Sequence, residues 1–235
     1  MKFNKNLAIF AILLLVICIV LASDVSATEF DGKSISDFDN DIKTSDDGNI
    51  ELTDDLSFNN KGTIEIDRPV TIDGRGHSIN ISSSQNDVLF DIKSDTTFKN
   101  IVLSGGDLAS SQDYVSIIRV SSSSILTFEN VTIKNVDIGD TVPNSYILNS
   151  GTLIIENSNF HDISCTNGHV LYNNLDSSVT YVNNTSYSES SCSFVAGSGG
   201  EFSVYNSNFH DLEVYDPLFS STSFGFAFNL QSSLF

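Results

Sequence analysis

Five asparagines recur along this chain in closely similar settings, and the distances between them limit the folds that it can adopt. Each follows a short strand-like stretch, as in Phe-Glu-Asn-Val and Ile-Glu-Asn-Ser, and the five are Asn100, Asn130, Asn157, Asn183 and Asn206. The intervals between them are 30, 27, 26 and 23 residues. A unit of this length cannot bury a core by itself, so consecutive units must stack on one another. The repeat therefore predicts a solenoid, and it disfavours an enzyme because catalysis usually needs residues that do not repeat.

The residues around each asparagine alternate between apolar and polar, which is the period of a β-strand. We expect the positions two before and three after the asparagine to point inward: Phe98, Phe128, Ile155, Tyr181 and Val204, then Leu103, Ile133, Phe160, Ser186 and Phe209. Asparagine suits a corner between strands, because it tolerates left-handed backbone and its amide can both donate and accept hydrogen bonds. We therefore expect the five asparagines to stack as a buried structural ladder.

The first part of the chain predicts export. Residues 1–27 carry two early lysines, an apolar run from Leu7 to Ala22 and small residues ending at Ala27, which is the pattern of a cleaved signal peptide. The run is shorter than the roughly 20 apolar residues that span a bilayer, so membrane attachment would occur only through an uncleaved signal. We expect the protein to be secreted or held in the cell envelope.

Two further segments follow the signal. Residues 28–68 are expected to hold an N-terminal cap and the first strands, including a short helix from Ser36 to Thr44 that presents Ile35, Phe38 and Ile42 on one face. An amphipathic helix of this kind can cover the open end of a solenoid. Residues 69–235 are expected to hold the repeats, with an irregular last turn at 217–235.

The charge of the chain excludes one class of partner. Thirty acidic residues against eleven basic ones give a formal net charge of -19, spread along the sequence. Phosphate backbones would be repelled, so we expect no binding of nucleic acid. The oligomeric state is left open.

Two cysteines lie outside the signal segment, Cys165 and Cys192. They stand eight and nine residues after Asn157 and Asn183, so they occupy similar places on successive repeats. Neighbouring strands lie about 4.8 Å apart, within the Cα separation of a disulfide, and exported proteins meet an oxidising compartment. We expect a Cys165–Cys192 disulfide, with two unpaired thiols as the alternative.

One segment carries a family resemblance. The sequence Thr-Ile-Asp-Gly-Arg-Gly-His-Ser-Ile at Thr71 to Ile79 resembles the opening signature of right-handed parallel β-helix proteins of the pectin-lyase-like class, and the later Phe-Glu-Asn-Val-Thr-Ile repeat resembles their inner repeats. Together with the expected signal, these segments also resemble adhesin-like surface proteins of methanogenic archaea. The resemblance implies an all-β, single-stranded right-handed parallel β-helix with a short N-terminal helical cap. It also implies a rigid surface that binds other cells or glycans without turnover.

An enzyme of the same fold is the alternative function. Pectin-lyase-like β-helices include polysaccharide lyases and glycoside hydrolases, but the sequence lacks the Asn-Thr-Asp, Gly-His-Gly and Arg-Ile-Lys sets of a polygalacturonase-like site. His161 and His210 are 49 residues apart, which is two repeats and too far for one metal ion. We therefore expect no catalytic, cofactor-binding or metal-binding residues.

Two asparagines and two tyrosines are the residues that we expect to carry or contact glycans. Asn80 and Asn184 match the acceptor pattern for N-glycosylation, and both are expected to lie outside the asparagine ladder. Tyr114 and Tyr146 stand beside variable loops and could stack on sugar rings. The expected partners are glycans or cell-surface proteins of other cells.

Overall fold

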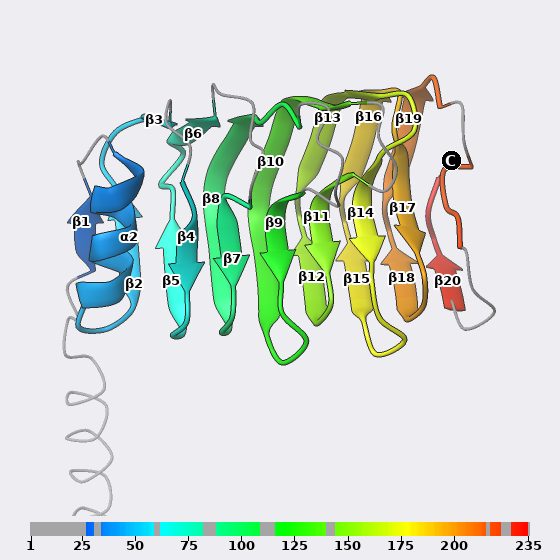
Figure 1. The fold of residues 1–235 in the computed structure, drawn as a ribbon. Helices are drawn as coiled ribbons and strands as arrows, with labels where there is room; N and C mark the ends of the chain where they lie inside the picture. Colours follow the sequence, from blue (N-terminus) through cyan, green and yellow to red (C-terminus); the bar gives the residue numbers. More distant parts are fainter. Residues whose placement is uncertain are drawn as a thin grey trace, which may run out of the picture.

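The chain winds about seven times into a right-handed parallel β-helix that is all-β apart from one short helix (Figure 1). The computed structural model describes residues 27–30, 34–58, 62–81, 88–108, 116–139, 144–214, 217–221 and 227–234. The fold predicted from the repeat and the resemblance is confirmed. Of residues 1–27, to which the export signal was assigned, residues 1–26 lie outside the described part.

Two parallel sheets form the walls of the β-helix, and one circuit of the chain through them is called a coil. The main path of the larger sheet runs through β1 (Thr28–Phe30), β2 (Asn49–Leu52), β5 (Val70–Asp73), β8 (Thr96–Gly105), β10 (Ile125–Gly139), β12 (Thr152–Glu156), β15 (Val179–Asn183), β18 (Glu201–Tyr205) and β20 (Ala227–Gln231). Its continuation past a corner is made by the second halves of β8 and β10 and by β3 (Leu56–Phe58), β6 (Ser78–Ile81), β13 (Asn159–Cys165), β16 (Ser186–Ser190) and β19 (Asn208–Leu212). The smaller sheet holds β4 (Ile64–Ile66), β7 (Phe90–Ile92), β9 (Ser116–Val120), β11 (Ser145–Asn149), β14 (His169–Asn173) and β17 (Ser193–Gly197).

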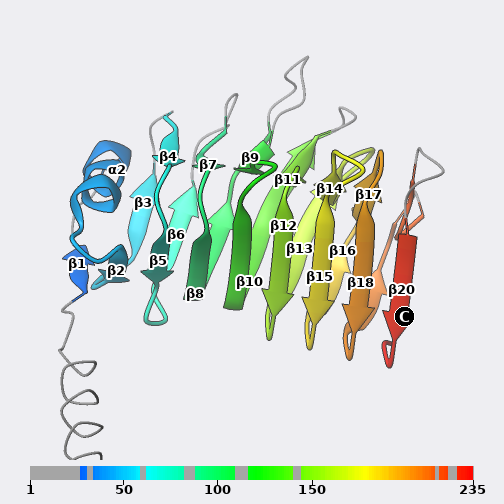
Figure 2. The same ribbon diagram turned by 90° about the horizontal axis from the view of Figure 1, so that it is seen from below.

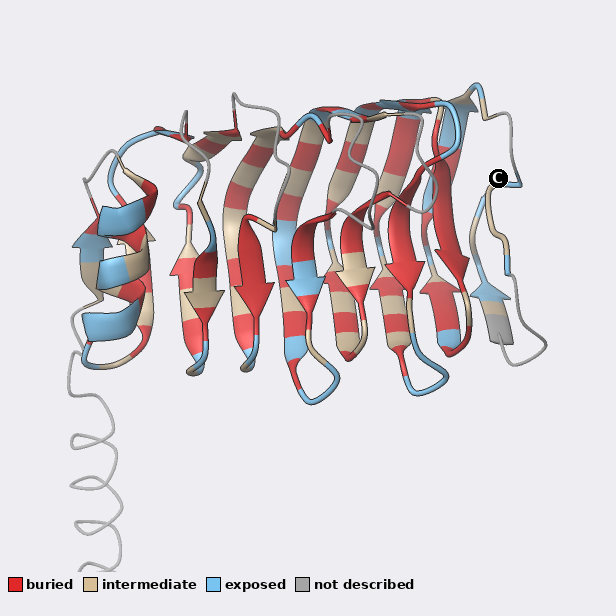
Figure 3. Ribbon diagram, in the orientation of Figure 1, coloured by how far each residue is buried: buried red, intermediate tan, exposed pale blue. Residues whose placement is uncertain are grey.

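The core is a set of stacked apolar columns. Phe128 pairs in register with Phe98 on one side and Ile155 on the other, and all three are 0% exposed. The rings of Phe90, Phe98 and Phe128 meet edge to face with centroids 5.2 and 5.8 Å apart. Figure 3 shows buried and less buried residues alternating along the strands, as the period of two requires.

A helix closes the N-terminal end, as the sequence predicted. Helix α2 (Ile35–Thr44) buries Ile35, Phe38 and Ile42, and the Oγ of its N-cap Ser34 accepts a 3.1 Å hydrogen bond from the backbone N–H of Asp37. The ring of Phe38 packs edge-on against Phe30 at 4.9 Å. In Figure 2 the helix covers the first coil at the end of the row.

The opposite end carries no such cover within the described residues. There β20 pairs with β18 alone, and Leu230 and Leu234 are 43% and 68% exposed. Among the described residues, no helix is long and apolar enough to cross a membrane.

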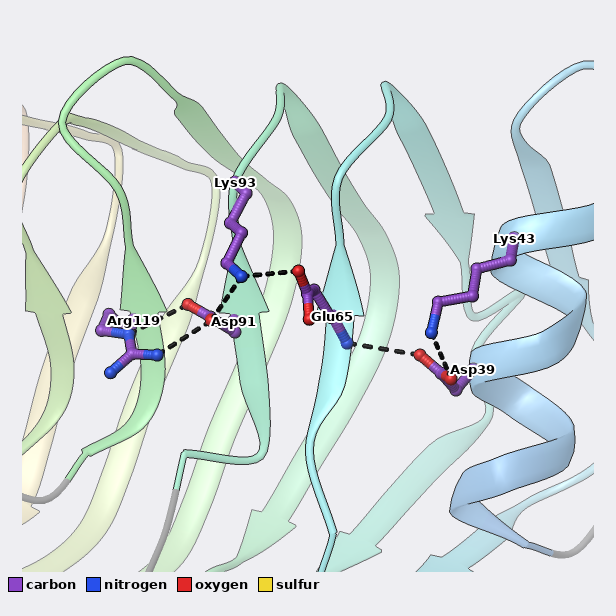
Figure 4. A network of polar contacts seen from close by, with 6 residues as sticks. All are labelled: Asp39, Lys43, Glu65, Asp91, Lys93 and Arg119. Carbon is purple, nitrogen blue, oxygen red and sulfur yellow. Dashed lines mark hydrogen bonds and ion pairs between the residues drawn. The ribbon is translucent and has the colours of Figure 1, made fainter.

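Ion pairs join neighbouring coils near the capped end (Figure 4). The guanidinium of Arg119 donates to both oxygens of Asp91, at 2.9 and 2.8 Å, from the next strand of the smaller sheet. Lys93 lies between Asp91 and Glu65, and the backbone N–H of Glu65 donates to Asp39 on the helix. The hydrogen bonds from Arg119 hold the pKa of the Asp91 carboxyl below its usual value against the opposing effect of its burial, and Lys93 adds to the lowering.

Candidate functional site

From β8 onward, each coil turns a corner at one residue with left-handed backbone. The residues at this corner are asparagines in five successive coils, with φ between 47° and 56°: Asn100, Asn130, Asn157, Asn184 and Asn206. Asparagine is one of the few residues with a side chain that adopts this conformation readily. The single residue redirects the chain from the main path of the larger sheet into its continuation.

The structure corrects one member of the predicted ladder. Asn184, and not Asn183, occupies the corner, because Asn183 is the last residue of β15 and pairs in register with Glu156. Moving the corner from Asn183 to Asn184 shifts the strand by one residue from the predicted register, so each of its side chains points to the face opposite the predicted one. Tyr181, expected to point inward, is therefore only half-buried, while Val182 is 0% exposed.

The asparagine side chains do form a ladder, but it lies on the outside of the β-helix. Asn130 donates to Asn100 at 2.9 Å, Asn184 donates to Asn157 at 2.7 Å, and Asn206 donates to Asn183 at 3.1 Å. No hydrogen bond joins the side chains of Asn130 and Asn157, both of which the structure describes. The expectation of a buried column was wrong, since the corner amides of Asn130, Asn157, Asn184 and Asn206 are exposed.

A second ladder, which sequence reasoning missed, lies directly beneath the first. The hydroxyls of Ser158, Thr185 and Ser207 each donate to the backbone carbonyl two residues earlier. Each also accepts a hydrogen bond of 3.1 to 3.4 Å from one backbone N–H of the preceding coil; the donors are Val131, Ser158 and Thr185 in turn. These three side chains are at most 5% exposed. The corner backbone is thereby satisfied from inside, so the asparagine amides are not required for it.

A shallow polar groove follows the asparagine corner across six coils. Its first section has a volume of about 610 Å³ and is lined by Asp73, Arg75, Gly76, Asn100, Ile101, Val102, Asn130 and Thr132. Its second section, of about 260 Å³, is lined by Asn130, Thr132, Asn157, Ser158, Asn159, Asn184, Thr185, Ser186, Asn206 and Asn208. The two sections share Asn130 and Thr132, so we treat them as one surface, the amide groove.

The floor of the amide groove has unused hydrogen-bonding capacity. Thr132, Asn159, Ser186 and Asn208 stand at matching register positions on successive strands. None of these four side chains has a hydrogen-bond partner within the described part of the chain. The Oδ1 atom of Asn159 is buried although it lacks a partner. A ligand in the open groove cannot reach this buried atom, so the hydrogen-bonding groups open to a ligand are the accessible atoms of the four side chains.

Two tyrosines lie beside the C-terminal section of the groove. The rings of Tyr181 and Tyr205 are 5.0 Å apart and tilted by 32°, and both are half-buried on the outer face of β15 and β18. Tyr205 immediately precedes the corner residue Asn206, and its hydroxyl accepts a 2.9 Å hydrogen bond from Asn229. The part of each half-buried ring that the other ring does not cover can pack against the apolar face of a sugar ring.

Charge is unevenly distributed along the groove. At its N-terminal end Arg75 pairs with Glu51 at 2.7 Å and Lys99 with Asp73 at 3.2 Å, so positive and negative groups balance. Farther along, Glu129 and Glu156 directly precede Asn130 and Asn157, and no lysine or arginine follows Lys134 in the sequence. The C-terminal part of the molecule therefore disfavours anionic ligands.

The tyrosines proposed from the sequence do not form this surface. Tyr146 is 0% exposed, and burial raises the pKa of its hydroxyl, so its assignment as a glycan contact was wrong. Gly106 lies nearby, since a Cβ added there would be 3.7 Å from the ring of Tyr146. Tyr114 lies outside the described residues.

The two predicted glycosylation sites both have engaged amides. Asn184 belongs to the ladder, so the expectation that it lies outside was wrong. Asn80 is half-buried and donates from Nδ2 to the backbone carbonyl of Leu56 at 3.3 Å and to the Ser78 hydroxyl at 3.0 Å. An amide that donates in this way must break these contacts to carry a sugar.

Cys165 and Cys192 form a disulfide between neighbouring coils, with their Cα atoms 5.1 Å apart. Both are buried, at 8% and 0% exposure. The hydroxyl of Tyr187 donates to the backbone carbonyl of Cys192 at 2.7 Å. The disulfide therefore ties the core at the corner that follows β13 and β16.

A buried amide pair on the smaller sheet is a further feature without a sequence prediction. Asn149 and Asn173 are 0% exposed and adjacent in register, and the Nδ2 of Asn149 donates to Oδ1 of Asn173 at 3.0 Å. Asn149 also donates to the carbonyl of Val179 and the hydroxyl of Thr180. The matching strand endings Ile-Leu-Asn and Leu-Tyr-Asn were the available signal.

A second groove, of about 450 Å³, lies along β13, β16 and β19 and is acidic, since Asp162, Glu189, Asp211 and Glu213 line it. His161 and His210 lie beside it, two coils apart in register, and each contacts the aspartate that follows it at 2.7 Å. No group of three or more metal-ligating side chains occurs among the residues that the structure describes.

Comparison with known proteins gives no match, whether to family models, to curated proteins or to solved structures.

Proposed function

We propose that this chain is an exported, adhesin-like β-helix that binds glycans of other cells along the amide groove and does not turn them over. The observation that carries the proposal is the groove itself, in which five successive coils, from that of Asn100 to that of Asn206, contribute amide or hydroxyl side chains to one open surface. Glycans are chains of hydroxyl groups that both donate and accept hydrogen bonds, as do asparagine, serine and threonine side chains.

The neighbouring surface supports the same class of ligand. Tyr181 and Tyr205 offer aromatic faces beside the polar groove, and such pairs of polar and aromatic groups suit a sugar, which has hydroxyl edges and an apolar face. The rigid stack of coils holds these groups in place before binding, so little conformational entropy is lost when a ligand binds. Nucleic acid fits poorly because of the charge of -19.

Export through residues 1–27 would place this surface in the cell envelope or outside the cell, where glycans and surface proteins of other cells are met. The proposal on location rests on the signal pattern in the sequence. Detection of the chain without residues 1–27 in the medium or on the cell surface would support it.

A glycan array probed with the protein lacking residues 1–27 tests the proposed function. We expect binding to a subset of glycans, weakened by the double variant Thr132→Val, Ser186→Ala and kept by Thr71→Val, which alters an outward threonine outside the groove. Shortened glycans after incubation would instead favour the alternative of a polysaccharide lyase or glycoside hydrolase. No binding to any glycan would refute the proposal.

A further inference from the structure

We propose that the ligand of the amide groove is an uncharged, extended β-1,4-linked glycan that runs along the axis of the β-helix with one sugar on each coil. This inference rests on the proposed glycan binding and adds the class of glycan and its direction. It follows from the spacing of the groove's polar groups, their number and the charge around them.

The spacing comes from the sheet. The corner asparagines and the floor residues Thr132, Asn159, Ser186 and Asn208 occupy equivalent positions on hydrogen-bonded strands. Equivalent positions on neighbouring strands are about 4.8 Å apart. The groove therefore presents the same pair of polar positions repeatedly at that interval along the axis.

Few polymers match such an interval. Sugars joined by diequatorial 1,4-linkages form a straight ribbon that advances along its axis by about the length of one pyranose ring per residue, close to the spacing of the coils. Successive rings are turned over, so neighbouring coils meet opposite edges of the sugar and every second coil meets the same edge. An extended peptide advances by about 3.3 Å per residue, so its groups would lose register with the coils after two or three residues. An α-1,4-linked glucan curves away from a straight groove.

The charges select among the extended glycans. Glu129 and Glu156 flank the groove, and the arginine and lysine at its N-terminal end are already paired with Glu51 and Asp73. A chain of uronic acids would be repelled by the glutamates and would find no unpaired cation among the residues that line the groove. A neutral chain meets neither difficulty.

The hydrogen-bonding capacity is sufficient for a neutral chain. Each corner asparagine uses at most one of its two Nδ2 hydrogens within the ladder. The floor side chains have no hydrogen-bond partner among the described residues, although the Oδ1 of Asn159 is itself buried and out of a ligand's reach. Each coil from Asn130 to Asn208 can thus offer a corner amide and a floor amide or hydroxyl to one sugar.

The length of the groove sets the size of the ligand. Six coils contribute lining residues, and five steps of about 4.8 Å span roughly 24 Å. We expect affinity to rise with each added sugar up to about a hexasaccharide and to stay constant beyond that length.

Isothermal titration calorimetry of the protein lacking residues 1–27 tests the inference, using cello-oligosaccharides from the disaccharide to the heptasaccharide. We expect the hexasaccharide to bind at least about tenfold more tightly than the trisaccharide. Malto-oligosaccharides and oligogalacturonides of the same lengths should bind at least about tenfold more weakly than the cello-oligosaccharides.

Variants locate the binding site in the same assay. Thr132→Val and Ser186→Ala should each weaken hexasaccharide binding about fivefold, which is the loss of one hydrogen bond. Ser123→Ala, at an exposed serine in the turn before β10, should leave it unchanged, and the melting temperature of each variant shows whether it is folded.

The outcomes separate the two proposals. Binding of other glycans with no preference for β-1,4-linked chains, or with no dependence on length, overturns the inference and leaves glycan binding standing. If Thr132→Val and Ser186→Ala leave the affinity for cello-oligosaccharides unchanged, the amide groove is not the binding site. Absence of binding to every glycan overturns the inference together with the proposed function.

Discussion

The Nδ2 of Asn184 donates a 2.7 Å hydrogen bond to the Oδ1 of Asn157 on the preceding coil, and both residues have left-handed backbone, with φ of 47° and 51°. The hydrogen bond is exposed to solvent, so its net contribution to stability is small. For residues other than glycine, asparagine and aspartate, the left-handed conformation costs about 1–2 kcal/mol. Backbone conformation should therefore matter more at this corner than the ladder.

Substitutions at Asn157 separate these two effects. Asn157→Ala should lower the free energy of unfolding by about 1–2 kcal/mol, and Asn157→Gly should lower it by about 1 kcal/mol less, because glycine adopts positive φ without a Cβ clash. Both variants remove the same side-chain hydrogen bond. Chemical denaturation measures the difference, and equal losses for the two variants would show that the ladder dominates. Asn159→Ala, at a position with ordinary φ, is the matched control.

The buried amide of Asn149 should be far more important to stability than the exposed ladder. It donates to Asn173, to the carbonyl of Val179 and to Thr180, and its Oδ1 accepts from the N–H of Gly151 at 3.0 Å. Asn149→Leu leaves several of these buried groups with neither their amide partner nor water, so we expect a loss of about 3 kcal/mol in the free energy of unfolding. Asn174→Ala, which removes one half-buried hydrogen bond to Ser150, should cost about 1 kcal/mol or less. A loss at Asn149 no larger than that at Asn174 would contradict the predicted role.

The disulfide between Cys165 and Cys192 should stabilise the fold by lowering the conformational entropy of the unfolded chain. The two residues are 27 positions apart, and closing a loop of that length removes about 3–4 kcal/mol of chain entropy from the unfolded state. The double variant Cys165→Ala, Cys192→Ala should lower the free energy of unfolding by about that amount. A reductant should lower the melting temperature of the natural sequence and leave that of the double variant unchanged. Equal sensitivity of both proteins to the reductant would mean that the disulfide is not responsible.

Acid should weaken the contact between Asp91 and Arg119. The guanidinium lowers the pKa of the Asp91 carboxyl in the folded protein, so the unfolded state binds its proton at a higher pH than the folded state does. The contribution to stability is complete above the ordinary aspartate pKa of about 3.9 and is lost as the pH falls through the lower folded-state value. Because Arg119 is half exposed, solvent screening limits the contribution to about 1–2 kcal/mol.

Melting temperatures between pH 6 and pH 2 measure this contribution. Asp91→Asn should flatten the decline at acid pH, and Arg119→Gln should flatten it as well, since it removes the main cause of the lowered pKa. An acid decline as steep in both variants as in the natural sequence would exclude the pair as its source.

Much of the fold could be predicted because its signals are local. The period of the asparagines predicted stacking, alternation around Phe98 and Phe128 predicted the inward face, and the spacing of Ile35, Phe38 and Ile42 predicted the helix. At Asn183 and Asn184 the local signal was ambiguous, because either residue can take a left-handed corner. Pairing of β15 with β12 resolved the choice.

The groove was harder to predict because it depends on contacts between coils. Nothing near Thr132, Asn159 and Ser186 in the sequence shows that they share one column. Tyr146 and Tyr181 show the same difficulty, since the first is buried in the assembled core and the second is turned outward by its register.

The amino-acid sequence alone therefore decided the repeat, the strand period and the cap, since each depends on the propensity and spacing of residues close together in the chain. Which corner amides are exposed, which tyrosines reach solvent and which side chains line the groove were decided only when the coils came into register. A shift of a single residue between strands exchanges the inner and outer faces, and strand register is set by the packing of whole coils.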